Sequence, residues 1–179
     1  MDTGVPKGDM RLASWPGEQP FAEGSEQEQR RHGMRLQSSG QFDVALPAAD
    51  AIDLFTPEGE RGWVPGWDPA YPTGQPSEDS GTVFVTMSGG VETTWVVLKI
   101  DRPGATAAYA RTTPGHHAGV VRVGCADAAN GHSTVEVAYD MTLLGNDPAG
   151  LDAYAEGRFD LMMQEWSDAI ATHLDGLPV

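Results

Sequence analysis

A glutamate and two tryptophans lie close together near the first third of the chain. Glu60 is followed by Trp63 and Trp67, and Pro57 and Pro65 restrict the backbone around them. A carboxyl group held beside indole rings loses water, which raises its pKa and suits it to exchange protons near neutral pH. The same carboxylate could instead accept backbone hydrogen bonds, or pair with a nearby arginine, and only fix the turn. The residues alone favour this structural role for Glu60.

Two charged residues lie on one side of a predicted C-terminal helix. Arg158 and Glu165 are seven residues apart, so they share a helical face with Met162 between them. One or both head groups could point into a cavity and orient a carboxylate or hydroxyl of a ligand. Long charged side chains at the edge of an apolar stripe more commonly reach water. Arg158 and Glu165 could therefore either face a cavity or lie in solvent.

The histidines and the single cysteine offer little further chemistry. His116 and His117 follow a Pro-Gly turn and His132 lies in another turn, so all three are expected to be solvated loop residues. A metal site would need a third ligand, and adjacent histidines in a turn usually point to opposite sides. Cys125 is expected to be a small core residue on a strand. No nucleotide-binding, serine hydrolase or zinc protease motif is present, so we expect no metal and no cofactor.

The elements that must position these residues are predicted from apolar spacing and from glycine and proline. Alternation predicts a strand over 34–45, and helical spacing after Pro47 predicts a short helix over 48–55. The region 56–74 is rich in proline, glycine and aromatic residues and is predicted to be a rigid turn region. Successive antiparallel strands are then predicted over 82–88, 92–101, 105–113, 119–127 and 133–144.

A long helix is predicted to follow these strands. It runs from Pro148 to about Leu174, with Asp147 as a candidate N-cap, and Gly176 and Pro178 end it. Its apolar positions form a stripe wide enough to lie across a sheet. The stripe consists of Leu151, Ala155, Phe159, Met162, Trp166 and Ile170.

These elements predict an α+β domain in which the long C-terminal helix covers the concave face of a curved antiparallel sheet. Their order resembles the helix-grip fold of the START and Bet v 1-like superfamily, also called SRPBCC. The resemblance is strongest over 54–67, which contains the pattern P-x-x-E-x-x-W-x-P-G-W of one subgroup, and it continues over 81–84 and 92–97. It implies a curved sheet wrapped around the long C-terminal helix, with two short helices after the first strand.

The resemblance also implies a ligand cavity between the sheet and the last helix. The superfamily includes lipid and hormone carriers, polyketide cyclases and co-chaperone modules, so the fold does not settle the function. The alternative is that the aromatic residues simply fill the core. The residues expected to bind a ligand are Glu60, Trp63, Trp67, Phe84, Trp95, Tyr109, Tyr139, Met141, Arg158, Phe159, Met162 and Trp166.

Composition narrows the remaining possibilities. The 179 residues include 26 acidic and 11 basic side chains, and a net charge of -15 does not attract nucleic acid. No apolar run approaches the roughly 18 residues of a membrane span, and a cytoplasmic location is expected. Residues 1–33 are predicted to be a flexible tail and residues 34–179 one domain, while the oligomeric state stays open.

The sequence therefore supports three hypotheses. The first is a protein that binds a hydrophobic small molecule, such as a lipid, a polyketide or an aromatic compound, between the sheet and the C-terminal helix. The second is an enzyme of the polyketide cyclase or dehydratase type, in which Glu60, Arg158 or Tyr109 moves protons. The third is an acidic protein-interaction module with little internal cavity.

Overall fold

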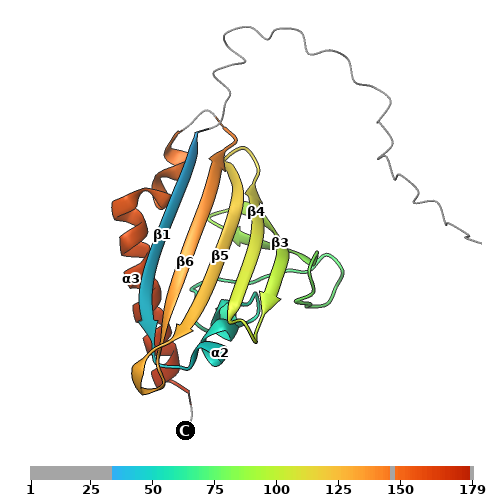
Figure 1. Cartoon of the computed structure of the whole chain (residues 1–179). Coiled ribbons are helices and arrows are strands. Elements are labelled where there is room, and N and C mark those ends of the chain that lie inside the picture. Colours follow the sequence, from blue (N-terminus) through green and yellow to red (C-terminus); the bar gives the residue numbers. More distant parts are fainter. Residues whose placement is uncertain (1–33, 146–147, 178–179) are drawn as a thin grey trace, which may run out of the picture. The chain divides into compact units, whose positions relative to one another are not determined.

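The computed structural model describes residues 34–145 and 148–177. One antiparallel sheet with the strand order β1-β6-β5-β4-β3-β2 forms the framework (Figure 1). The predicted tail 1–33 and the candidate N-cap Asp147 lie outside the described residues. The strands are β1 (Arg35–Val44), β2 (Val83–Ser88), β3 (Val91–Asp101), β4 (Thr106–Thr113), β5 (His117–Asp127) and β6 (Ser133–Leu143).

The strands form where apolar residues alternate with polar ones, as the sequence predicts. In β6 the side chains of Val135, Val137, Tyr139 and Met141 are buried, while the residues between them face outward. Residues 133–142 of β6 are paired on both sides, by β1 and by β5. This double pairing makes β6 the centre of the sheet half that supports the C-terminal helix.

Short helices follow the first strand, also as expected. The helix α2 (Ala48–Ala51) continues directly as the 3-10 helix η1 (Ile52–Phe55), and a second 3-10 turn, η2 (Gly59–Gly62), follows. Ile52 and Phe55 are buried, so this segment closes one end of the core. The arrangement of curved sheet, short helices and C-terminal helix confirms the α+β helix-grip fold.

The predicted single helix over 148–174 is wrong at its N-terminal end. The structure has a 3-10 helix, η4 (Pro148–Tyr154), and then the helix α3 (Glu156–Asp175). Ala155 between them has an extended backbone (ψ 148°), and its carbonyl accepts the hydrogen bond of the Phe159 amide, 2.8 Å away. The break allows the Tyr154 ring to stack on Tyr139, with ring centroids 5.2 Å apart. Tertiary packing therefore overrides the helical spacing here.

Helix α3 packs closely on β1 (Figure 1). Phe159, Met163 and Ile170 form its buried side. A side chain at Gly40 of β1 would begin 2.6 Å from Met163 Cγ and 3.3 Å from a Phe159 ring carbon. Glycine at this position therefore lets the helix approach the sheet.

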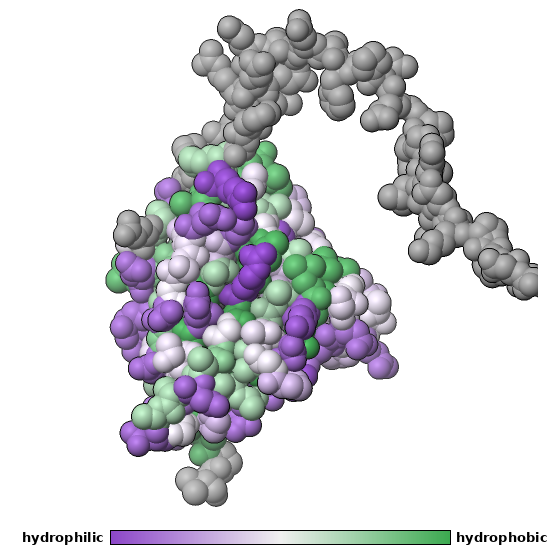
Figure 2. All heavy atoms as spheres, viewed as in Figure 1, coloured by the Kyte–Doolittle hydropathy of each residue, from purple (hydrophilic) through white to green (hydrophobic). Residues whose placement is uncertain are grey.

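The exposed surface is mixed in character. Hydrophilic and hydrophobic residues are interspersed on the face seen in Figure 2. Ion pairs on the surface include Arg35 with Asp140 and Arg102 with both Asp53 and Glu78. Among the described residues, no helix is both long and apolar enough to cross a lipid bilayer.

Candidate functional site

A cavity of about 370 Å³ lies between the inner face of the sheet, α3 and the 57–71 segment. Strands β2 to β6 contribute its floor, and η4 and α3 close one side. Valines 121 and 123 supply part of the apolar wall. The ring-bearing and functional side chains of the wall are Glu60, Trp67, Trp95, Tyr109, Arg111, Tyr139, Tyr154, Met162 and Trp166.

Tryptophan rings dominate the apolar part of this wall. Trp67 meets Trp95 edge to face at 5.6 Å between ring centroids, and Phe84 stacks on Trp95 at 5.8 Å with nearly parallel planes. Trp166 of α3 meets Trp63 edge to face at 5.3 Å. Buried neighbouring rings hold the lining tryptophans in place, because edge-to-face and offset contacts stabilise aromatic pairs.

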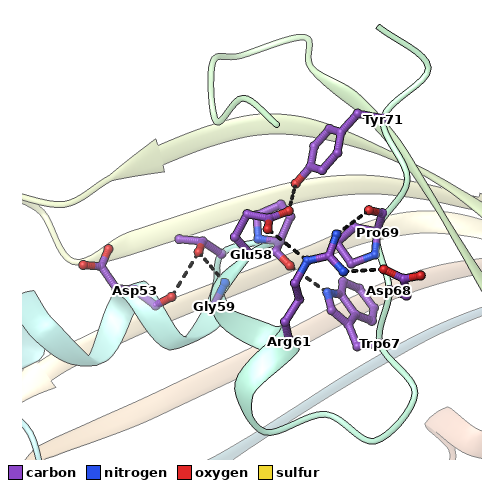
Figure 3. Close-up of polar contacts among 10 residues, drawn as sticks. Asp53, Glu58, Gly59, Arg61, Trp67, Asp68, Pro69 and Tyr71 are labelled. Carbon is purple, nitrogen blue, oxygen red and sulfur yellow. Dashed lines mark hydrogen bonds and ion pairs between the residues drawn. The ribbon is translucent and has the colours of Figure 1, made fainter. Parts of the chain in front are cut away.

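The 57–71 segment is fixed by its own polar contacts (Figure 3). The Glu58 carboxylate accepts hydrogen bonds from Arg61 Nε at 2.9 Å and from the Tyr71 hydroxyl at 2.8 Å. The Arg61 guanidinium also binds the Asp68 carboxylate and donates to the Pro69 carbonyl at 2.7 Å. One glutamate and one arginine therefore connect both ends of the segment.

The indole N–H groups of this segment are also satisfied internally. Trp63 Nε1 donates to the Leu54 carbonyl at 2.7 Å, and Trp67 Nε1 donates to the Pro57 carbonyl at 2.8 Å. Their polar edges are thus turned away from a ligand. Trp67 offers the cavity only its apolar ring.

Glu60 lies in this fixed segment and lines the cavity. Its pKa rises from the ordinary 4.5 to about 8, chiefly because burial disfavours the charged form, while the positive charge of Arg111 lowers it by less. Glu58, and not Glu60, forms the structural pair with Arg61. The carboxyl group of Glu60 is therefore mostly protonated at pH 7, and in that state it can donate a hydrogen bond.

Arg111 of β4 is a cavity residue that the sequence interpretation missed. Its guanidinium carbon lies 4.5 Å from the centroid of the Trp95 ring and 5.9 Å from that of Tyr154. It occupies the same strand face as Tyr109 and Thr113, which are both buried. Arg111 lies two residues after Tyr109 and two before Thr113, and this spacing was the signal that could have placed it on the buried face of the strand.

The tyrosines of the cavity are held as neutral groups. Burial raises the pKa of Tyr109 and of Tyr139 above the ordinary value of 10. The Tyr109 hydroxyl donates to the Phe55 carbonyl at 2.8 Å, so its proton is committed to the backbone. The Arg111 guanidinium donates a hydrogen bond to the Tyr139 hydroxyl. Neither tyrosine is suited to act as a base at neutral pH.

His117 corrects the prediction that the histidines lie in solvated loops. It opens β5 and is buried, with its ring 5.4 Å from that of Tyr154. Its Nε2 lies 3.3 Å from both the Thr113 hydroxyl and the Tyr154 hydroxyl. His116 and His132 are exposed. His117 thus supports Tyr154 at the end of the cavity.

The structure separates the predicted ligand-binding residues into three groups. One group lines the cavity and consists of Glu60, Trp67, Trp95, Tyr109, Tyr139, Met162 and Trp166. A second group is buried in the core outside the lining and consists of Trp63, Phe84, Met141 and Phe159. Arg158 is exposed on α3 and does not line the cavity. Glu165 is also exposed.

Within the described part of the chain, the cysteine is not a reactive thiolate and no metal-binding cluster is found. Cys125 is half-buried, and burial raises the pKa of its thiol to about 11. Among residues 34–145 and 148–177, no group of three histidine, cysteine or acidic side chains is arranged to hold a metal ion. The cavity therefore offers one carboxyl group, one guanidinium and several aromatic rings.

Comparisons with known proteins identify the fold. No family model matches the sequence, and no curated protein matches it. The crystal structure of Ara h 8.0201 is similar, with a TM-score of 0.59 and 16% identity over 80% of this chain and 100% of that chain. Norcoclaurine synthase from Thalictrum flavum, in complex with dopamine and hydroxybenzaldehyde, has a TM-score of 0.58 and 10% identity over 91% of this chain and 100% of that chain.

A third solved structure is also similar in fold. DynU16, a protein in the dynemicin biosynthetic locus, has a TM-score of 0.55 and 13% identity over 78% of this chain and 47% of that chain. At such identities the likeness shows the helix-grip fold alone. The P-x-x-E-x-x-W-x-P-G-W pattern stays a resemblance in sequence.

Proposed function

We propose that this protein binds a small aromatic molecule in the cavity between its sheet and α3. The observation that carries the proposal is the wall itself: Trp67, Trp95 and Trp166 enclose a space of about 370 Å³ that also contains Glu60 and Arg111. Cavities of this size, mostly apolar and with a few placed polar groups, are the usual sites for small ligands. Planar rings suit the tryptophan walls because they can stack or meet them edge to face.

The fold supports this proposal without deciding the ligand. Norcoclaurine synthase, which shares the fold, holds dopamine and hydroxybenzaldehyde, both of them small aromatic compounds. We further propose that the chain is a member of the SRPBCC superfamily, because the sequence resemblance over 54–67 falls on the segment that closes the cavity. Lipids and polyketides are the other hydrophobic ligands that the sequence leaves open.

Titration with the neutral fluorescent probe N-phenyl-1-naphthylamine tests the binding function. We expect the probe emission to rise on addition of protein, with a Kd on the order of micromolar for an apolar ligand of this size. Val121 is buried in β5 and lines the cavity. The substitution Val121→Trp fills part of the space, so it should weaken probe binding by about tenfold or more.

The matched control is Val120→Trp on the same strand. Val120 is half-buried and is absent from the cavity wall, so its substitution should leave probe affinity unchanged. Circular dichroism would verify that both variants fold. If the wild-type protein binds no probe, or if Val121→Trp binds it as well as wild type, the cavity is not the site, and the interaction-module hypothesis gains support.

A second candidate function is proton-transfer catalysis in the same cavity. Glu60 favours it, because a carboxyl group with a pKa of about 8 can both donate and accept a proton near neutral pH. The structure offers Arg111 in place of Arg158 as the cationic partner. Incorporation of deuterium into a bound aromatic ketone, present in wild type and absent in Glu60→Gln, would distinguish an enzyme from a binding protein.

A further inference from the structure

Arg111 is a cation inside the cavity of an acidic protein. The chain has a net charge of -15, yet this guanidinium lies on the inner face of the sheet among aromatic rings. Its Nε is buried and has no hydrogen-bond partner within the described residues. No ion pair of residues 34–145 and 148–177 involves Arg111.

Such a charge is costly to keep without an anion. Removing an ion from water carries a large free-energy cost in real proteins, and cation–π contacts return only part of it. The Trp95 and Tyr154 rings supply contacts of that kind. These contacts and the hydrogen bond that Arg111 donates to Tyr139 compensate its charge only in part, because none of the groups involved is an anion.

The neighbouring groups do not neutralise Arg111 at pH 7. Tyr139 and Tyr154 approach it as neutral hydroxyl-bearing rings, since burial raises the pKa of both. Tyr109 is on the same strand, and its hydroxyl donates a hydrogen bond to the Phe55 carbonyl. Glu60 is the only acidic residue among the described residues that line the cavity, and it is mostly protonated at this pH. The described cavity wall thus holds one guanidinium, and the buried Nε of that group has no hydrogen-bond partner.

We propose that the ligand of this cavity is an aromatic carboxylate whose carboxylate group binds the Arg111 guanidinium. This inference rests on the proposed function and specifies the chemical class of its ligand. A planar guanidinium matches a carboxylate with two parallel N–H···O bonds, which a lysine or a neutral donor does not provide. The tryptophan walls hold the aromatic part, and the protonated Glu60 carboxyl donates to a further oxygen.

A matched pair of ligands tests the proposal in the wild-type protein. Naphthalene-2-carboxylate and naphthalene-2-carboxamide have nearly the same shape, and only the first is charged at pH 7. Isothermal titration calorimetry should give about 10- to 100-fold tighter binding of the carboxylate, which is the range of a charge-assisted hydrogen bond. Equal affinities of the two ligands would overturn the proposal without any variant.

Arg111→Gln then identifies the residue responsible. This variant should lose about 10- to 100-fold in affinity for the carboxylate and change its affinity for the carboxamide by less than about threefold. The control is Arg122→Gln, which removes an exposed charge from the neighbouring strand β5 and should change neither affinity. If Arg111→Gln weakens both ligands equally, Arg111 shapes the cavity and does not recognise the anion.

The outcomes separate this inference from the binding function. If the carboxamide and the neutral naphthylamine probe bind but the carboxylate has no advantage, the binding function stands and the ligand class is wrong. If none of the three molecules binds, the binding function fails together with the inference. Should Arg111→Gln not fold, Arg111→Lys keeps the charge without the planar fork and should retain carboxylate binding only in part.

Discussion

Replacing Phe159 with alanine should lower the free energy of unfolding by about 3 to 5 kcal/mol. Phe159 is 2% exposed, and its ring meets that of Tyr139 edge to face at 5.6 Å. It also contacts the side of β1 where Gly40 allows α3 to approach the sheet. The substitution leaves a cavity at the point where the helix is anchored, and urea denaturation followed by circular dichroism measures the loss.

Leu161 provides the matched control on the same helix. It is 55% exposed, so Leu161→Ala should change the stability by no more than about 0.5 kcal/mol. A small loss for Phe159→Ala together with a large loss for Leu161→Ala would mean that α3 is rotated about its axis. The cavity described above would then have a different wall.

Glu60→Gln should stabilise the protein at pH 7 by about 3 kcal/mol. The Glu60 carboxyl has a pKa of about 8 in the folded protein and about 4.5 when exposed by unfolding. Between these values the unfolded chain releases the proton and the folded protein keeps it, so wild-type stability falls as the pH rises from about 4.5 to 8. At pH 7 this difference amounts to about 2.5 pKa units, each worth 1.36 kcal/mol.

Urea denaturation at pH 5, 7 and 9 measures this effect. The neutral glutamine resembles the protonated glutamate, so the difference between variant and wild type should be small at pH 5 and largest at pH 9. Glu92→Gln, at an exposed position on β3, is the control and should change the stability at pH 7 by no more than about 0.5 kcal/mol. A Glu60→Gln variant that is less stable than wild type at pH 7 would show that the folded protein holds this carboxyl group ionised.

Strand β6 and helix α3 illustrate how much of the fold the sequence predicts. Alternation along Val135, Val137 and Tyr139 correctly predicts β6, because a strand with one buried face requires that period. The stripe containing Phe159 correctly predicts a helix that packs on the sheet. The break at Ala155 was not predictable from spacing, since it depends on the contact between Tyr154 and Tyr139.

The site was predicted less completely than the fold. Glu60 was selected for its tryptophan neighbours, and the structure places it in the cavity wall with a raised pKa. Arg158 was selected for its position near the helix stripe, but it directly precedes Phe159 and so points about 100° away from that residue around the helix. Phe159 is buried and Arg158 is exposed.

Arg111 was missed because β4 gives a weak pattern. Ala107, Ala108 and Ala110 occupy both faces of this strand, so apolar alternation is weak and only Tyr109 marks the inner face. Pairing with β3 and β5 decides the phase, and that pairing is a tertiary property. The spacing of two residues from Tyr109 was the signal that could have placed Arg111 on the inner face.

A crystal structure of the protein grown with naphthalene-2-carboxylate tests the central claim most directly. We expect the naphthalene ring to lie in the cavity lined by Trp67, Trp95 and Trp166, with the carboxylate within hydrogen-bond distance of the Arg111 guanidinium. A cavity that contains no ligand in such crystals, or a ligand bound only to the outer face of the sheet, would contradict it.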